Sequence, residues 1–156
     1  MKVLFIHQNF PGQFIHLAGA LAREKRNQVL ALSIHKLPVP AGVKLRTYTM
    51  LRPSVPETHP LLQDQEAKVL RAEACAAAAM QLKREGFEPD VIVAHPGWGE
   101  ALLIKEVYPR ARLVIYCEYY YAVEGQDVGF DPEIPALNFQ QRCKLRLRNA
   151  TNLLSL

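Results

Sequence analysis

The chain has 156 residues, of which 49% are hydrophobic and 22% charged, and its formal net charge is +4. This composition is that of one globular domain. It excludes a fully disordered chain, and the length excludes a domain so small that it needs a metal ion or disulfide bonds to fold. No segment approaches the roughly 18 uninterrupted apolar residues of a membrane span, and the first residues lack the apolar core and cleavage site of a signal peptide. We therefore expect a cytoplasmic protein.

The net charge and the cysteine content bear on two further classes, nucleic-acid-binding proteins and proteins held by disulfides or zinc. A net charge of +4 is too small to indicate nucleic acid binding by itself, and we expect no nucleic acid partner. The three cysteines, Cys75, Cys117 and Cys143, are far apart and odd in number. This pattern favours neither a disulfide framework nor a zinc site. We expect reduced thiols and no bound metal.

Buried strands alternate with helices along the sequence. Apolar runs bounded by polar or turn-forming residues predict strands at 2–8, 28–34, 43–50, 91–94 and 113–117. Helical spacing of apolar residues, or a composition rich in Ala, Leu, Glu and Lys, predicts helices at 14–25, 61–84, 100–107 and 136–156. A long polar and aromatic loop, 118–135, precedes the last helix.

This alternation predicts an α/β fold over residues 1–156. Strands that alternate with helices favour a Rossmann-like, doubly wound, mostly parallel sheet with helices on both faces. Right-handed crossovers favour the strand order 3-2-1-4-5. Ligands of such sheets bind at the carboxyl ends of the strands, where the strand order reverses. Here that point lies between the first strand and the strand that ends at Ala94.

Polar and aromatic residues follow three strands at this edge. The candidates are His7, Gln8, Asn9 and the Pro11-Gly12 turn after the first strand, His95, Gly97, Trp98 and Glu100 after the fourth, and Glu118, Tyr119, Tyr120 and Tyr121 after the fifth. Because these strand ends meet at one edge of the sheet, the sequence predicts a polar ligand site with two histidines, carboxylates and aromatic rings.

Each candidate has a chemical and a structural interpretation. His95 is suited to act as a general base or to bind a sugar hydroxyl, or else it caps the next helix. Partial burial of Glu118 would raise its pKa and suit it to accept a proton, or else it pairs with a local arginine. We interpret His7 chiefly as structural. The three tyrosines and Trp98 are suited to stack on a sugar ring, or else to join the core.

The first loop and the last helix carry further signals. Gly12 opens a helix, where its backbone can approach an anion closely, or it simply starts the helix. The G-x-G-x-x-G fingerprint is absent, so NAD is not expected. The last helix carries cations, which indicate a solvated face or contact with an anionic ligand or membrane surface. Its apolar residues predict self-association as a homodimer. These residues are Leu147, Leu153, Leu154 and Leu156.

Several motifs together resemble a known family. KVLFIHQNFPGQFIHLAGAL, GFEPDVIVAHPGWGEALLIKEVYP, YCEYYY, FDPE and LRLRNATNLL resemble the N-terminal domain of glycosyltransferase family 4 (group 1) enzymes. The resemblance implies a GT-B architecture of two Rossmann-like domains and sugar transfer that retains configuration without a bound metal. The N-terminal domain binds the acceptor, and a C-terminal domain binds the nucleotide-diphosphate sugar donor.

The resemblance also implies roles for individual residues. Gly12, in its turn with Pro11, matches the glycine that approaches the donor diphosphate. His95 and the segment 97–100 match an H-x-GWGE motif, and Glu118 matches the start of E-[FY]-[FY]-Y. Many family members have a histidine after the fifth strand, where this chain has Glu118. We expect His95 and Glu118 to be catalytic and the other candidates to bind the acceptor.

The expected function is therefore acceptor binding by one half of a retaining glycosyltransferase. The donor domain is absent from this sequence, so we expect an incomplete N-terminal half that binds no cofactor of its own and is inactive alone. Its expected partners are a sugar or glycolipid acceptor and the donor domain, with peripheral contact at the inner face of the membrane. The alternative is a stand-alone module that binds a small ligand or a protein without catalysis.

Overall fold

The computed structural model describes residues 1–126 and 128–155. The strands are β1 (Lys2–Ile6), β2 (Gln28–Ser33), β3 (Val43–Thr47), β4 (Val91–Ala94) and β5 (Arg112–Ile115). The helices are α1 (Ile15–Arg23), α2 (Gln63–Arg84), α3 (Ile104–Val107) and α4 (Phe139–Leu154), with a 3-10 turn, η1 (Gly12–Phe14), before α1. None of the described helices is long and apolar enough to cross a membrane.

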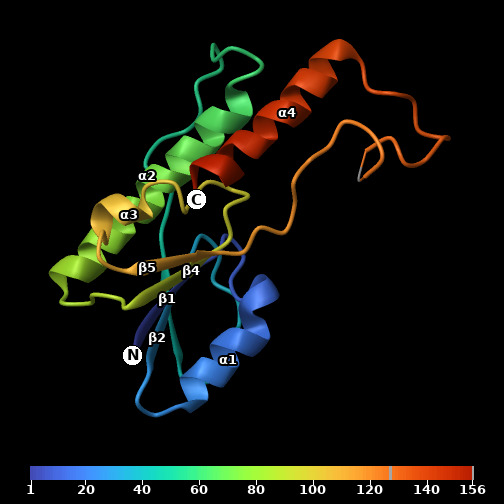
Figure 1. The fold of residues 1–156 in the computed structure, drawn as a ribbon. Coiled ribbons are helices and arrows are strands. Elements are labelled where there is room, and N and C mark those ends of the chain that lie inside the picture. The colour runs from blue at the N-terminus through green and yellow to red at the C-terminus, as the bar shows by residue number, and fades with distance from the viewer. Residues whose placement is uncertain (127, 156) are drawn as a thin grey trace.

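The five strands form one sheet in the order β3-β2-β1-β4-β5, and all neighbours are parallel. This confirms the predicted fold class and strand order. The order reverses between β1 and β4, so the residues after these two strands meet at the predicted edge. Figure 1 shows α1 on one face of the sheet and α2, α3 and α4 on the other.

The two faces of β1 explain this layering. Leu4 and Ile6 belong to the core beneath α2, whereas Val3 and Phe5 pack with Phe14 and the rest of the α1 layer. Because successive strand residues point to opposite faces, a short continuous apolar run covers both layers. The buried middle of α2 is rich in alanine, which lets this helix lie close to the sheet.

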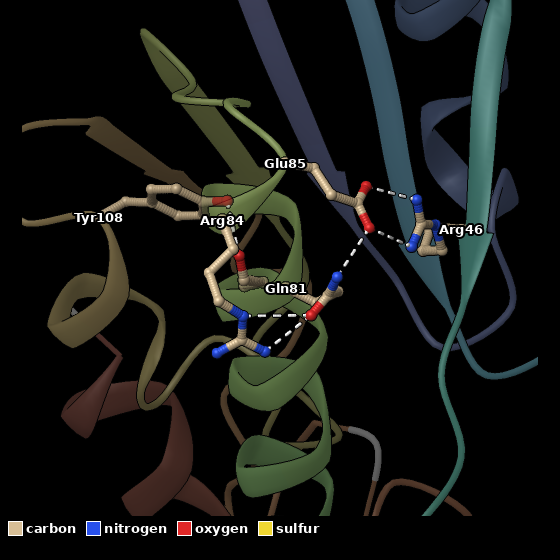
Figure 2. Close-up of polar contacts among 6 residues, drawn as sticks. Arg46, Gln81, Arg84, Glu85 and Tyr108 are labelled. Carbon is tan, nitrogen blue, oxygen red and sulfur yellow. Dashed lines mark hydrogen bonds and ion pairs between the residues drawn. The ribbon is translucent and has the colours of Figure 1, made fainter.

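Polar contacts fix the end of α2, as Figure 2 shows. The guanidinium of Arg46 on β3 donates to both oxygens of Glu85, at 3.2 and 2.8 Å. Gln81 also donates to Glu85 and accepts from Arg84. On the other side of the helix, the hydroxyl of Tyr108 donates to the Ala79 carbonyl at 2.9 Å. These contacts tie α2 to the edge strand and to the segment after α3.

The predicted helix at 100–107 is wrong in its first half, because only Ile104–Val107 is helical. The preceding backbone forms successive turns, with Leu102 N–H donating to Gly99 O and Ile104 N–H to Ala101 O. Gly99 has φ +103°, and a Cβ on it would lie 2.4 Å from the Lys68 carbonyl oxygen. This close approach to α2 holds the chain in turns and delays the helix.

The last helix docks on α2 through polar groups. Asn138 caps it, and its side chain accepts from Gln141 N–H. Gln65 on α2 donates to the Leu147 carbonyl at 2.7 Å, and the Thr151 hydroxyl donates back to Gln65 at 3.3 Å. Of the leucines predicted to self-associate, Leu153 and Leu154 are 59% and 71% exposed. Leu147 is half-buried, and Leu156 lies outside the described residues.

Candidate functional site

His7 leaves β1 with both ring nitrogens engaged. The backbone N–H of Asn9 donates to Nδ1 at 3.0 Å, which assigns the ring proton to Nε2. Nε2 then donates to the Gln13 side-chain oxygen at 2.7 Å. Gly12 makes this fit, because its φ is +44° and a Cβ there would lie 2.4 Å from His7 Cε1. Burial lowers the pKa of His7, and His95 lowers it further, so this ring is neutral near neutral pH.

His95, which follows β4, repeats the same local pattern. The Gly97 N–H donates to its Nδ1 at 3.1 Å, and its Nε2 lies 3.1 Å from Glu118 Oε2. A Cβ on Gly97 would lie 2.8 Å from His95 Cε1. A glycine placed two residues after the histidine therefore lets the loop turn tightly enough to hold the ring.

Glu118 joins the two histidines through Gln13. Its Oε2 accepts from the Gln13 side-chain amide at 2.9 Å and from His95. The four side chains of His7, Gln13, Glu118 and His95 form one connected set, hereafter the polar network. Hydrogen bonds from Gln13 and His95 lower the pKa of Glu118. The prediction that burial would raise this pKa is wrong, because the side chain is 32% exposed and accepts two hydrogen bonds.

Aromatic rings pack around the polar network. Trp98 lies against His95 with ring centroids 4.4 Å apart, and its edge meets His7 at 5.0 Å. After β5, the rings of Tyr119 and Tyr121 stack on each other at 5.9 Å. These tyrosines are not part of the core, since Tyr119 is 48% exposed and Tyr121 is half-buried.

His95 and Glu118 line a cavity of about 260 Å³ beside the sheet edge. Its walls come from the first half of α2, the loop after β4, the segment after β5 and the end of α4. The lining residues are Asp64, Lys68, Arg71, His95, Pro96, Gly97, Trp98, Glu118, Tyr119, Tyr121, Arg148 and Asn152. Six predicted site residues thus share one cavity: His95, Gly97, Trp98, Glu118, Tyr119 and Tyr121.

The other candidates lie around this cavity without lining it. His7 belongs to the polar network but does not line the cavity. Asn9 and Gly12, which follows Pro11, lie against the His7 ring. The backbone oxygen of Gln8 accepts from Ser33, and its side-chain oxygen is buried without a described partner. Tyr120 is 61% exposed.

Glu100 is the most deeply buried candidate, with only 1% of its surface exposed. One carboxyl oxygen accepts from the Tyr48 hydroxyl at 3.0 Å, and the other has no partner among the described residues. Burial raises the pKa of Glu100. This carboxyl does not line the cavity, and its hydrogen bond to Tyr48 ties the loop after β4 to the end of β3.

Sequence reasoning missed Gln13, Lys68 and Arg71. Gln13 directly follows Gly12, and its place in the loop after β1 was a usable signal. Lys68 and Arg71 lie in a segment whose composition predicts a helix and nothing more. The sequence therefore does not distinguish them from cations that face solvent. The segment that carries Tyr119 and Tyr121 is held by α4, because the side chains of Asn149 and Asn152 bond to its backbone.

The described residues offer no cluster of three His, Cys, Asp or Glu side chains that could hold a metal ion. The chemistry that they offer is hydrogen bonding and charge. The polar network presents an ionised carboxylate to a small cavity whose walls carry aromatic rings and three cations. This arrangement can bind a hydroxyl-rich ligand of the size of a single ring.

Comparisons with known proteins agree with the fold. A family model described as "Glycosyl transferase family 4 group" matches residues 25–156. Among solved structures, the chain is similar to that of apo UGT2 from Phytolacca americana, with 13% identity and a TM-score of 0.50. That match covers 74% of this chain and 28% of the other, so it concerns the fold alone. A search of curated proteins found no match.

Proposed function

Because the chain belongs to the glycosyl transferase family 4 group, we propose that it is the acceptor-binding part of a glycosyltransferase. In this proposal the cavity binds the acceptor, and Glu118 contacts the hydroxyl that receives the sugar. The donor, a nucleotide-diphosphate sugar, is bound by a part of the protein beyond this sequence. The turn at Pro11 and Gly12 stays our prediction for the contact with the donor diphosphate.

The observation that carries the proposal is the hydrogen bonding of Glu118. Its Oε2 accepts from Gln13 and His95, while no described residue donates to Oε1. A carboxylate whose pKa is lowered stays ionised near neutral pH, so Oε1 is a hydrogen-bond acceptor on the cavity wall. An acceptor hydroxyl that donates to it gains electron density on its own oxygen, which favours attack on the anomeric carbon. As the new bond forms, the hydroxyl proton passes to Glu118 and the nucleoside diphosphate leaves with the electrons of the broken bond.

The same geometry gives His95 a positioning role. Its Nδ1 accepts from Gly97 N–H and its Nε2 donates to Glu118. With both nitrogens engaged in these hydrogen bonds, the ring has no lone pair left to accept a proton from a hydroxyl. We therefore infer that His95 orients Glu118, and that His7 and Gln13 support it from the other side.

The aromatic walls support a sugar as the bound group. Sugar rings pack their apolar faces on aromatic side chains while their hydroxyls bond to polar groups. Trp98 and the stacked pair Tyr119 and Tyr121 line the same cavity as Glu118. Pockets for drug-sized ligands span about 300–1,000 Å³. A cavity of about 260 Å³ thus suits one sugar ring.

The test uses the only tryptophan of the chain, Trp98, as a fluorescent reporter on the cavity wall. Titration with monosaccharides is expected to change its emission in a saturable way. Glu118→Gln is expected to weaken binding at least tenfold, about 1.4 kcal/mol, because a neutral amide is a weaker acceptor for the hydroxyl. Glu88→Gln is the matched control, since this exposed carboxylate pairs with Arg110 outside the cavity.

Three outcomes separate the proposal from its alternatives. Equal sugar affinities of the wild type and Glu118→Gln would remove Glu118 from the site. Turnover of a nucleotide sugar by this chain alone would contradict its role as one half of an enzyme. Sugar binding without any transfer by a longer protein that contains this chain would favour a binding module instead.

A further inference from the structure

The cavity carries positive charge that the polar network does not use. Lys68 and Arg71 come from α2 and Arg148 comes from α4, and all three line the cavity. We propose that the acceptor is a sugar with an anionic oxygen group, a carboxylate or a phosphate, which Arg71 and Arg148 bind. This inference rests on the proposed acceptor site and adds the charge of the substrate to it.

The charges of the lining do not cancel. Three permanent cations face two carboxylates, Asp64 and Glu118. Asp64 is already paired, because its Oδ2 lies 2.9 Å from the ammonium of Lys68, whose side chain is only 7% exposed. Among the described residues, neither Arg71 nor Arg148 has a carboxylate oxygen within 4.0 Å. These two guanidinium groups are the cations left for a ligand.

Arg71 is fixed beside the loop after β4. One of its terminal nitrogens donates to the Trp98 carbonyl at 3.2 Å. A guanidinium has five N–H donors in a fixed fork, so most of its donors have no partner among the described residues. Burial raises the pKa of Glu100, and Arg71 opposes this effect without forming an ion pair with it among the described residues.

Arg148, on α4, is placed by its neighbours. Its guanidinium carbon lies 5.7 Å from the centre of the Tyr121 ring. Asn149 bonds to both the N–H and the carbonyl of Tyr121, each at 2.8 Å, which fixes the backbone of Tyr121 beside the helix. A guanidinium that lies over a ring keeps its N–H edge for an oxyanion, and both carboxylates and phosphates match that edge.

The two kinds of charge in the lining then orient the ligand. Glu118 repels an anionic group and accepts from a hydroxyl, whereas the two arginines attract the anion. An acceptor sugar therefore places its reacting hydroxyl at Glu118 and its carboxylate or phosphate toward α2 and α4. A neutral sugar satisfies only the first contact, so the cavity discriminates between acceptors by charge.

The experiment compares matched sugars by Trp98 fluorescence at low salt: glucose, glucuronate and glucose 6-phosphate. We expect at least one anionic sugar to bind tenfold or more tightly than glucose, and this preference is expected to shrink as salt is added. Whichever anion binds more tightly identifies the group as a carboxylate or a phosphate. Equal affinities for all three sugars would overturn the inference and leave the proposed function standing. Binding of none of them would overturn both.

Two variants test the arginines directly. Arg148→Gln and Arg71→Gln are each expected to abolish most of the preference for the anionic sugar, measured as the ratio of the anionic-sugar affinity to the glucose affinity of the same variant. Exposed Arg146 on the same helix and Arg84 on α2 lie outside this cavity, so Arg146→Gln and Arg84→Gln are the matched controls. Because Arg71 lies near buried Glu100, a folding defect of its variant is checked by thermal melting. Arg148→Gln alone then decides, and an unchanged preference in it would overturn the inference.

Discussion

Gln13 is the link of the polar network that a single substitution tests most cleanly. Gln13→Leu removes the acceptor of the His7 Nε2 proton and one of the two donors to Glu118. His7 is 3% exposed, and a buried N–H left without an acceptor costs about 1–3 kcal/mol. Gln13 itself is exposed, so water partly replaces it. We therefore expect a loss of about 1–2 kcal/mol in the free energy of unfolding.

The same substitution has a second, independent effect on Glu118. The hydrogen bond from Gln13 is the largest cause of its lowered pKa, so Gln13→Leu is expected to raise that pKa toward its ordinary value of 4.5. A carboxyl with a lowered pKa stabilises the fold above its unfolded pKa, and this contribution is lost as the pH falls through the folded pKa. Glu118 is thus expected to contribute less to the fall in the free energy of unfolding at acidic pH in the variant than in the wild type.

Carbon-detected NMR titration of the Glu118 carboxyl measures this shift, and urea unfolding measures the stability. Exposed Gln140 on α4 has no side-chain hydrogen bond to a described residue, so Gln140→Leu is the control and is expected to change neither quantity. A Gln13→Leu protein with an unchanged Glu118 pKa would refute the polar network as the structure describes it.

Three further predictions test neighbouring features. Gly12→Ala is expected to lower the free energy of unfolding by about 2 kcal/mol or more, because its Cβ would clash with His7. Gly86 also has a positive φ but open space around it, so Gly86→Ala is expected to lower that free energy by less. Thermal melts measure both. Burial raises the pKa of Glu100, so the folded protein loses stability as the pH rises from the unfolded pKa through the folded one. Glu100→Gln is expected to remove that loss in urea unfolding, and an unchanged slope would contradict it. The exposed Leu153 and Leu154 are expected to drive self-association, which analytical ultracentrifugation measures. A double substitution of both to Gln is expected to abolish it, and a wild type that stays monomeric at high concentration would contradict this.

The fold was predictable because its signals are local and repeat along the chain. The apolar residues of β1 pack into both layers of the core. Because strands and helices alternate along the chain, few strand orders are possible, and the observed order is one of them. The turns at 98–103 were not predictable, because they depend on Gly99 meeting the Lys68 carbonyl of a helix about 30 residues earlier. That contact exists only after the layers have packed.

The candidate site was predictable to the extent that strand order places residues at one edge. His95, Trp98 and Glu118 share the cavity, as expected from the ends of β4 and β5. The pKa of Glu118 was mispredicted because its direction depends on hydrogen-bond partners, and Gln13 carries no signal beyond its loop. Arg71 was equally hidden, since a cation on a helix faces a site or solvent according to how the helix packs. For Arg148, the sequence left open a solvated face or contact with an anionic ligand or membrane surface.

The most direct test of the central claim is the rate of sugar transfer by a longer protein that contains this chain and a donor domain. The wild type is compared with Glu118→Ala and His95→Ala, and with Glu88→Gln as the control. We expect each of the first two variants to lose at least tenfold in rate, about 1.4 kcal/mol of barrier, while the control keeps the wild-type rate. Wild-type kinetics in both variants would contradict the assignment of this cavity as the acceptor site.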